Sequence, residues 1–442
     1  MSFAFGFWRW ALLSAAGVLS VGPQALADPA TELDIEQVVA AVEPRVIAWR
    51  RDIHQHPELG NRETRTAGLV AEHLRGLGLD EVRTGIAHTG VLGVLRGGKP
   101  GPVVALRADM DALPVTEPEG LPFASRVRTL YNGQEVGVMH ACGHDAHTAI
   151  LMGTAEVLAG MRDAIPGTVV FIFQPAEEGA PEGEEGGAKM MLAEGLFDSL
   201  EPEAIFALHV LPRRAGNLYY TRGSTMAGSD NLKITVSGKQ THGAMPHFGI
   251  DPITVSAQII TALQTIPSRQ LDAVKSPTIV SIGSIHGGVR GNIIPDQVEL
   301  TGTIRTLDPE SRDDVLARIK RTAEMIAESA GARAEVQIEQ YSPVLHNDPE
   351  LVQRMVPTLQ RVAGDEQVVQ ALPVTPSEDF AYFSERIPGF YFFLGINKAG
   401  LDWAPPNHSP HFFINEDTLA VGVRAMSAVA LDYLQGLPGQ QM

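Results

Sequence analysis

The sequence predicts an α/β protein in which a mostly parallel central sheet, flanked by helices, is interrupted by a smaller inserted unit. Three observations support this prediction. Short apolar strands alternate with helices in the first and last parts of the chain, an order typical of parallel sheets. After Gly228 this alternation gives way to a different order of strands and helices, and it returns near Glu350. The length of 442 residues is sufficient for two units, each with a hydrophobic core of its own.

The first part of the chain supplies most strands of the predicted central sheet. These strands are short apolar runs, as expected where both faces are buried, and they lie at residues 91–95, 103–106, 169–173 and 205–208. Helices are expected at residues 35–49, 64–77 and 148–158. Pro44 should break or kink the first helix, because proline removes a hydrogen bond from the helix interior. In such sheets ligands gather at the carboxyl ends of the strands.

The middle of the chain has the element order β-α-β-β-α-β, which is that of the split, ferredoxin-like unit. Its elements are expected at residues 231–237, 252–266, 278–283, 298–305, 311–330 and 334–340. The α/β pattern then resumes with a helix from Glu350, a strand at 390–394 and a closing helix at 418–434. We therefore predict a principal domain made of residues 28–228 and 342–442, with residues 229–341 inserted as a separate small domain.

The first 27 residues have the pattern of a cleavable signal peptide. Arg9 precedes an apolar run from Trp10 to Val21, and Ala25-Leu26-Ala27 matches a small-x-small cleavage site. The alternative is a buried N-terminal helix, which the clean restart at Asp28-Pro29 disfavours. A cut after Ala27 predicts a periplasmic or secreted protein. No later stretch has the length and hydrophobicity of a membrane span, so no stable membrane insertion is expected.

Composition excludes several classes of function. The formal net charge is −18 and there is no basic block, which argues against nucleic acid as a partner. Apolar residues make up 44% of the chain, too many for a disordered protein. Cys142 is the only cysteine, so no internal disulfide can form. In an oxidising compartment this thiol is either buried and inert or the ligand of a metal.

A thiol and several imidazoles lie just before a predicted helix. Gly143 separates Cys142 from His144, and on a loop both side chains can turn toward one centre. A thiolate with an imidazole suits zinc, and cobalt, nickel or manganese are also compatible. Asp145 either orients His144 or lies in the first helical turn, where negative charge is favourable. His147 is attributed to packing.

Two adjacent glutamates, Glu177 and Glu178, directly follow the strand at 169–173. Carboxylates this close resist joint ionisation unless a cation neutralises one of them. One would then bind metal and its neighbour would serve as general base, while the alternative is a solvated acidic loop. His209 ends a strand and His408 precedes the last helix. Each histidine alone would be attributed to structure, but the four segments together favour a metal site.

Five motifs, in order, resemble those of the aminoacylase and carboxypeptidase-like amidohydrolases. The closest branch is that of hippurate hydrolases, N-acyl-amino-acid amidohydrolases and plant indole-acetyl-amino-acid hydrolases. The motifs are RADMDALP from Arg107, MHACGHDAHTA from Met139, FQPAEE from Phe173, ALH ending at His209 and NHSPHF from Asn407. The resemblance, from about Ile47 to Tyr433, implies cleavage of the amide bond of N-acyl amino acids or similar conjugates with a free carboxylate. It also implies that the inserted unit is a lid through which two subunits form a homodimer.

The resemblance further implies a centre of two divalent metal ions, zinc or else manganese, cobalt or nickel. Its ligands would be Cys142, His144, Glu178, His209 and His408. Glu177 would be the general base, and His242 of the lid would reach a substrate held by the partner subunit. Asn292 and Arg305 would contact the substrate, although an arginine on an exposed sheet face would explain Arg305 equally well. Asp109 and Asp111 would support a ligand histidine, but turn chemistry explains them nearly as well.

Two alternatives to an N-acyl-amino-acid hydrolase stay open at this point. One is a dipeptidase or carboxypeptidase with the same two-metal site. The other is a non-catalytic periplasmic protein that binds metal or amino-acid conjugates, against which the spare carboxylate of Glu177 speaks. The segment Ser377-Glu378-Asp379-Phe380 also resembles a motif of the family, but its chemistry indicates no role.

Overall fold

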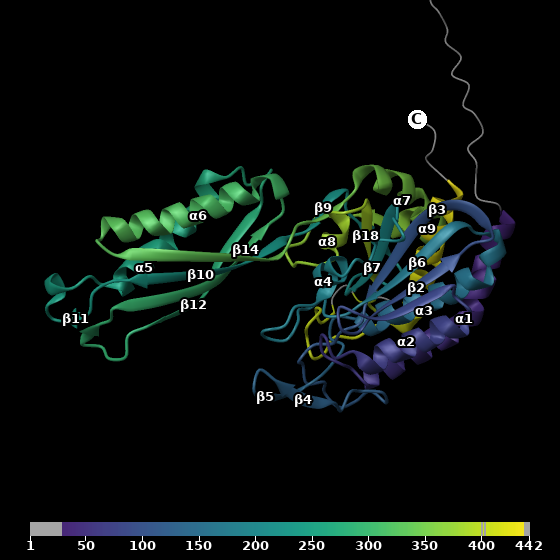
Figure 1. Cartoon of the computed structure of the whole chain (residues 1–442), viewed down its shortest axis with the longest axis horizontal. Coiled ribbons are helices and arrows are strands. Elements are labelled where there is room, and N and C mark those ends of the chain that lie inside the picture. Colours follow the sequence, from purple (N-terminus) through teal and green to yellow (C-terminus); the bar gives the residue numbers. More distant parts are fainter. Residues whose placement is uncertain (1–28, 399–400, 402–403, 437–442) are drawn as a thin grey trace, which may run out of the picture.

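The computed structural model describes residues 29–398, 401 and 404–436. The predicted signal peptide, residues 1–27, lies outside this range. The described chain forms two lobes side by side along its longest axis, as Figure 1 shows. Within the described residues, the larger lobe contains an eight-stranded sheet and the smaller lobe a four-stranded sheet.

The eight-stranded sheet is parallel at its centre and mixed toward its edges. In spatial order its strands are β1 (Glu81–Ile86), β2 (Gly90–Arg96), β6 (Pro166–Gln174), β3 (Lys99–Asp109), β7 (Ala204–Leu211), β18 (Gly389–Gly395), β8 (Leu218–Tyr220) and β17 (Val368–Gln370). The pairs β6–β3, β3–β7 and β7–β18 are parallel. The pairs β1–β2, β2–β6 and β18–β8 are antiparallel, and the edge pair β8–β17 is again parallel. The predicted α/β class is therefore confirmed. The half-exposed strand β1 and the short strands β8 and β17 carry no long apolar run, and the sequence pattern did not predict them.

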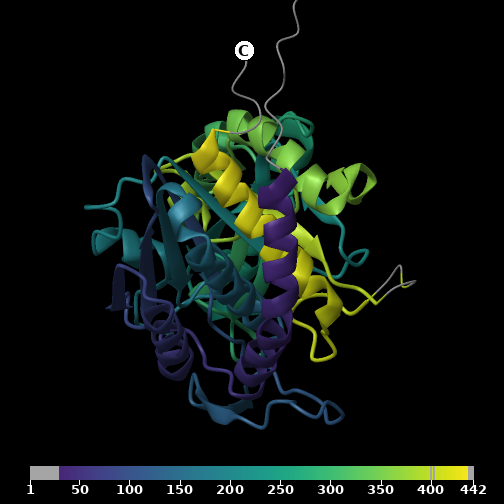
Figure 2. The same ribbon diagram turned by 90° about the vertical axis from the view of Figure 1, so that its right-hand side faces the viewer.

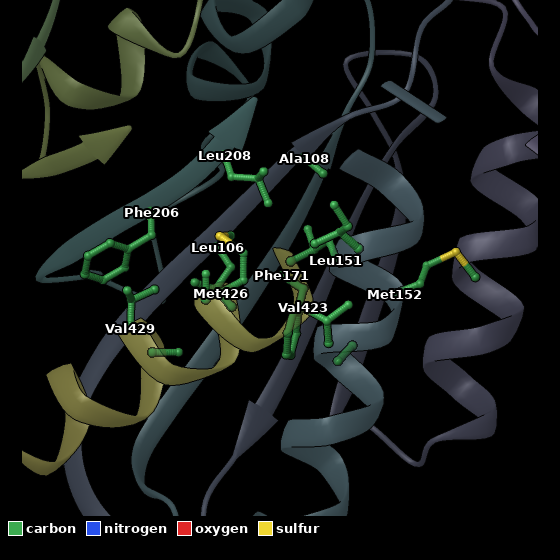
Figure 3. Packing of buried hydrophobic residues seen from close by; sticks show 14 of the residues in the cluster. Leu106, Ala108, Leu151, Met152, Phe171, Phe206, Leu208, Val423, Met426 and Val429 are labelled. Carbon is green, nitrogen blue, oxygen red and sulfur yellow. The ribbon is translucent and has the colours of Figure 1, made fainter. Parts of the chain in front are cut away.

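Helices cover both faces of this sheet because alternate strand residues point to opposite sides. On one face lie α1 (Pro29–Gln55), α3 (His144–Gly160) and α9 (Leu419–Gln435), and Figure 2 shows α1 and α9 side by side. Figure 3 shows Leu106 of β3, Phe171 of β6 and Phe206 of β7 packing against Leu151 of α3 and Met426 of α9. The opposite face is covered by α4 (Gly187–Ala193) and α8 (Ala381–Ser384). The remaining helices of the larger lobe are α2 (Thr64–Gly76) and α7 (Pro349–Ala363).

Helix α1 continues through Pro44, so of the two predicted effects of this proline, a break or a kink, the break does not occur. Val39, Val42, Val46 and Ile53 are buried along one side of the helix, where it packs on α3 and α9. This apolar stripe has helical spacing. The free energy gained by burying this stripe offsets the loss of the backbone hydrogen bond that the proline removes.

The smaller lobe consists of an antiparallel sheet with two helices packed on one face. Its strands, in spatial order, are β12 (Thr278–Gly287), β14 (Gln297–Thr306), β10 (Gly228–Ser237) and β15 (Arg333–Ser342). Its helices are α5 (Pro252–Leu263) and α6 (Pro309–Ser329), and a short pair of strands, β11 (Thr241–His242) and β13 (Ile293–Ile294), lies beside them. Leu232, Ile234 and Val236 alternate along β10 and pack under both helices. The role of this lobe as a lid stays a prediction.

Two short antiparallel pairs of strands complete the larger lobe. They are β4 (Arg128–Tyr131) with β5 (Gln134–Gly137), and β9 (Gly223–Met226) with β16 (Leu345–Asn347). None of the helices in the described residues has both the length and the apolar character needed to cross a membrane.

Candidate active site

The predicted site residues converge at the carboxyl ends of three neighbouring strands. Asp111 follows β3, Glu177 and Glu178 follow β6, and His209 lies near the end of β7. These strands are parallel neighbours, so their carboxyl ends share one edge of the sheet. His144 is the first residue of α3, which begins four residues earlier than the sequence pattern predicted.

The five predicted metal ligands lie together. The ligand atoms of Cys142, His144 and His209 are within 4.8 Å of one another, and so are those of Cys142, Glu178 and His408. Cys142 Sγ lies 3.4 Å from His209 Nε2. His408 Nε2 lies 2.9 Å from Glu178 Oε1. Because Cys142 belongs to both groups, its sulfur could bind either of two cations held there.

These donors fit divalent cations by their chemistry. Nε2 of His144 is buried and has no hydrogen-bond partner among the described residues. Burial and the negative charges of Glu178 and Glu177 raise the pKa of the Cys142 thiol well above its ordinary value. A thiolate therefore needs a cation beside it. Burial and the neighbouring His147 lower the pKa of His209, which keeps this ring in the neutral form that metals bind.

Asp111 connects two of the predicted ligands. Nδ1 of His144 lies 3.2 Å from Asp111 Oδ1, and the backbone N–H of Glu178 donates to Oδ2 at 2.9 Å. Burial alone would lower the pKa of His144, but the charge of Asp109 and the hydrogen bond to Asp111 raise it to about 10. The same carboxylates make Nε2 a stronger donor toward a cation. Asp111 therefore supports a predicted ligand histidine and does not merely shape the turn before Leu113 and Pro114.

Asp109 influences His144 through its charge, but its close contact is with a different histidine. Its Oδ1 lies 2.6 Å from His147 Nδ1 and 3.8 Å from His144 Nδ1. His147 in turn accepts a hydrogen bond at its Nε2 from the backbone N–H of Val210, which follows His209. His147 thus links α3 to β7 as a structural residue.

Asp145 does not contact His144. Its Oδ2 accepts a hydrogen bond from Arg50 Nε at 2.8 Å and lies 2.8 Å from His54 Nδ1. Successive side chains on a helix point in different directions, so Asp145 faces α1 while His144 faces the site. The alternative assignment, a carboxylate in the first turn of α3, matches the structure. The sequence pattern offered no signal for Arg50 or His54, whose partner lies more than 90 residues away.

Glu177 is buried beside the ligand cluster. Its Oε2 lies 3.9 Å from His144 Nε2, and its Oε1 accepts a hydrogen bond from the backbone N–H of Asp379 at 3.4 Å. Burial, together with the charges of Glu378 and Glu178, raises the pKa of Glu177 well above its ordinary value. A carboxylate in this environment is suited to accepting a proton.

The backbone around the site is unusual in two places. Ala176, just before Glu177, has a φ of 49°, and His408 has a φ of 70°. Non-glycine residues seldom adopt this left-handed conformation, and where they do it often coincides with a functional site. The side chain of Asn407 donates hydrogen bonds to the carbonyls of Cys142 at 3.0 Å and Val210 at 3.3 Å. Asn407 thereby ties the segment of His408 to the other ligands, a role that the sequence reading did not assign to it.

A cavity of about 620 Å³ opens on the ligand cluster and Glu177. Much of the remaining wall is apolar and consists of Leu211, Pro212, Met226, Pro373, Val374, Pro376, Phe393 and Pro406. A substrate bound here would therefore place an apolar group against this wall and its amide beside the polar cluster.

The predicted catalytic histidine of the smaller lobe, His242, and the two predicted substrate contacts, Asn292 and Arg305, lie in two different places. His242, on β11, and Asn292, beside β13, are exposed at the end of the smaller lobe that lies away from the large sheet (Figure 1). Arg305 lies on β14, and its Nη1 donates a hydrogen bond to Ser377 Oγ of the larger lobe at 2.9 Å. Within one chain, the cluster around Cys142 is therefore not joined by His242 or Asn292.

Comparison with known proteins agrees with this geometry. The model of the peptidase family M20/M25/M40 matches residues 105–432. The chain is 42% identical to thermostable carboxypeptidase 2 of Saccharolobus solfataricus over 89% of its own length and 97% of that protein. It is 37% identical to the N-acetylcysteine deacetylase of Bacillus subtilis over 89% of its length and 98% of that protein.

A solved structure shares both the fold and much of the sequence. The YXEP protein of Bacillus subtilis, described as a dinuclear metal-binding peptidase, superposes with a TM-score of 0.76 at 36% identity. The match covers 90% of this chain and 100% of that one. The resemblance seen in the five motifs is thus confirmed, and the chain belongs to the peptidase family M20/M25/M40.

Proposed function

We propose that this protein is a metal-dependent amidohydrolase that cleaves the amide bond of N-acyl amino acids or similar conjugates with a free carboxylate. The observation that carries the proposal is Glu177, a buried carboxylate on the wall of one cavity with four of the five cation donors, Cys142, Glu178, His209 and His408, and with His144 grouped behind them. The names of two relatives, a carboxypeptidase and a deacetylase, support the same bond type. A protein that only bound metal would have no use for the additional carboxylate.

We assign two divalent cations to Cys142, His144, Glu178, His209 and His408. Zinc is the cation that a thiolate with imidazoles favours, and manganese, cobalt or nickel are the alternatives. Two cations in this position would polarise the amide carbonyl and lower the pKa of a water molecule. Glu177 would accept the proton of the attacking water and return it to the nitrogen of the departing amine.

The smaller lobe would complete the site in a homodimer. His242 and Asn292 are exposed at the far end of the lobe, where they can reach a second subunit. Large apolar side chains are exposed in the same loop and on the adjacent elements, namely Met245, Phe248, Ile253, Ile285 and Val289. Such a surface is typical of a protein interface. Arg305 would bind the free carboxylate, which its guanidinium fits in a bidentate manner.

The test is metal analysis of the purified protein coupled to a panel of N-acyl amino acids and dipeptides. The expected result is two divalent cations per chain and faster hydrolysis of the acyl amino acids. Faster cleavage of dipeptides would support the dipeptidase or carboxypeptidase alternative. Binding of conjugates without product, measured by mass spectrometry, would support the non-catalytic alternative.

The contribution of the partner subunit can be tested by mixing two inactive variants. If His242 acts in trans, a heterodimer of Glu177→Gln and His242→Ala subunits contains one intact site and regains activity. If His242 acts within its own chain, both sites of the heterodimer stay defective. Light scattering on the wild-type enzyme should show a dimer, and an active monomer would refute action in trans.

Export to the periplasm or the medium is also proposed, on the pattern of residues 1–27 alone. N-terminal sequencing of the protein purified from its natural source should then begin at Asp28. A mature protein that retains Met1 would contradict export by this signal.

A further inference from the structure

The segment Ser377-Glu378-Asp379-Phe380, to which the sequence assigned no role, lies beside the proposed general base. Glu378 and Asp379 are both buried. Both carboxylates accept hydrogen bonds from Nη2 of Arg107, at 3.0 Å to Glu378 Oε1 and 3.2 Å to Asp379 Oδ1. Arg107 is itself 1% exposed. A buried cation shared by buried carboxylates tolerates little displacement, because an unpaired charge there is costly.

Glu378 is held from three directions. Besides the bond from Arg107, its Oε1 accepts one from the backbone N–H of Phe380 at 2.9 Å. Its Oε2 accepts one from the hydroxyl of Tyr391 at 2.5 Å. Tyr391 lies on the central strand β18 and is fully buried. Hydrogen bonds to an ionised acceptor are the strong ones, so these contacts fix the turn on the rigid sheet.

The other end of the turn is held as firmly. The carboxylate of Asp379 accepts hydrogen bonds from Gln174 Nε2 at 2.7 Å and from the backbone N–H of Ala188 at 2.8 Å. Gln174 is the last residue of β6, the strand that leads to Glu177. The ligand atoms of Glu177, Glu378 and Asp379 lie close enough to hold a cation, but two of the three carboxylates, those of Glu378 and Asp379, already pair with the guanidinium of Arg107.

The fixed turn presents one group to Glu177. The backbone N–H of Asp379 donates to Glu177 Oε1 at 3.4 Å, while Oε2 faces His144 and the ligand cluster. One oxygen of the base is therefore anchored and the other is directed at the reacting centre. Such a division is useful because proton transfer requires the accepting oxygen within hydrogen-bond reach of the water.

We propose that Glu378 is a positioning residue for Glu177. Held by Arg107 and Tyr391, it fixes the turn of Ser377–Phe380, so that the N–H of Asp379 orients the carboxylate of the base. This inference rests on the proposed function, because it takes Glu177 as the general base. It adds a positioning unit formed by Arg107, Glu378 and Tyr391.

The test uses Tyr391→Phe, which removes only the hydroxyl that holds Glu378. We expect kcat for an N-acyl amino acid to fall by at least about tenfold, since small misplacements of a catalytic group have effects of this size. KM should stay within twofold of the wild-type value, and the cation content should not change. Tyr220→Phe on the neighbouring strand β8 removes a hydroxyl outside this unit and serves as the matched control. Glu378→Gln, which keeps the size and one acceptor oxygen, should give an intermediate loss.

A double-mutant cycle separates positioning from a general structural effect. If Glu378 and Tyr391 act through Glu177, then Tyr391→Phe causes no further loss of kcat in the Glu177→Gln background. Unchanged kcat in Tyr391→Phe, a rise in KM alone, or additive losses in the double variant would each overturn the inference. If the wild type cleaves no amide of the panel, the proposed function falls and this inference with it. An active wild type with an unaffected Tyr391→Phe variant overturns the inference alone.

Discussion

Gly143 occupies a position where an added side chain would press on Val210, the neighbour of the predicted ligand His209. It is the N-cap of α3 with a φ of 101°, and an added Cβ would lie 2.3 Å from Val210 Cγ2. Val210 follows His209 on β7, and His209 Nε2 lies 3.4 Å from Cys142 Sγ. A side chain at 143 therefore pushes directly on the strand that carries one ligand.

The free-energy cost of Gly143→Ala is the sum of a backbone cost and a packing cost. A left-handed backbone costs an L-residue about 1–2 kcal/mol. To restore ordinary contact, Val210 would have to retreat by about 1 Å, and overpacking of this kind costs about 1–3 kcal/mol. The sum is about 2–5 kcal/mol. If the strain relaxes by moving His209 away from Cys142, cation affinity should fall by about 30-fold or more, since about 1.4 kcal/mol corresponds to a factor of ten.

The assay is competition for zinc against a fluorescent chelator, with urea unfolding of the metal-free protein alongside it. Gly160→Ala is the matched control, because this residue ends the same helix and an added Cβ meets no atom within 4 Å. The control should bind cations normally and gain about 0.5–1 kcal/mol of stability. If Gly143→Ala binds two cations with wild-type affinity, the strain does not reach His209, and the inferred coupling between Gly143 and the ligand cluster is refuted.

Three further predictions concern the base, the cations and pH. Glu177→Gln should retain both cations in metal analysis and lose turnover by about 10²–10⁴-fold, the usual contribution of a general base; wild-type rates would reject the assignment. Exhaustive treatment with a strong chelator should abolish hydrolysis, and zinc, manganese or cobalt should restore it; activity that survives chelation would exclude the metal mechanism. Burial and the charge of Asp111 raise the pKa of Glu63 to about 8. Between this pKa and the ordinary pKa of about 4.5 that the carboxyl has in the unfolded chain, Glu63 is protonated in the metal-free folded state but ionised in the unfolded chain. The contribution of Glu63 to the free energy of unfolding therefore decreases as the pH rises from about 5 to 8. Glu63→Gln should reduce this loss in urea unfolding at the two pH values, and an unchanged pH dependence would contradict the assigned shift.

The sequence by itself determined the fold class of this protein and the chemistry available at its site. Both are local properties of the chain. The strands β2, β3, β6 and β7 contain short apolar runs, and such runs indicate strands buried on both faces, of which β3, β6 and β7 are parallel neighbours. Glu177 and Glu178 could be placed at a strand end because strand and glutamates are adjacent in the chain. The continuation of α1 through Pro44 was not predictable in this way, because it depends on burial against α3 and α9.

Only the tertiary structure decided which side chains orient the site. Asp145 contacts Arg50 and His54 instead of its neighbour His144. The hydrogen bond between Arg107 and Glu378 joins residues 271 positions apart. The sequence pattern reports which face of an element is apolar, but the partner of a buried polar group is set by how distant elements pack. For the same reason only the fold shows that β11, the strand of His242, lies at the end of the smaller lobe away from the eight-stranded sheet (Figure 1).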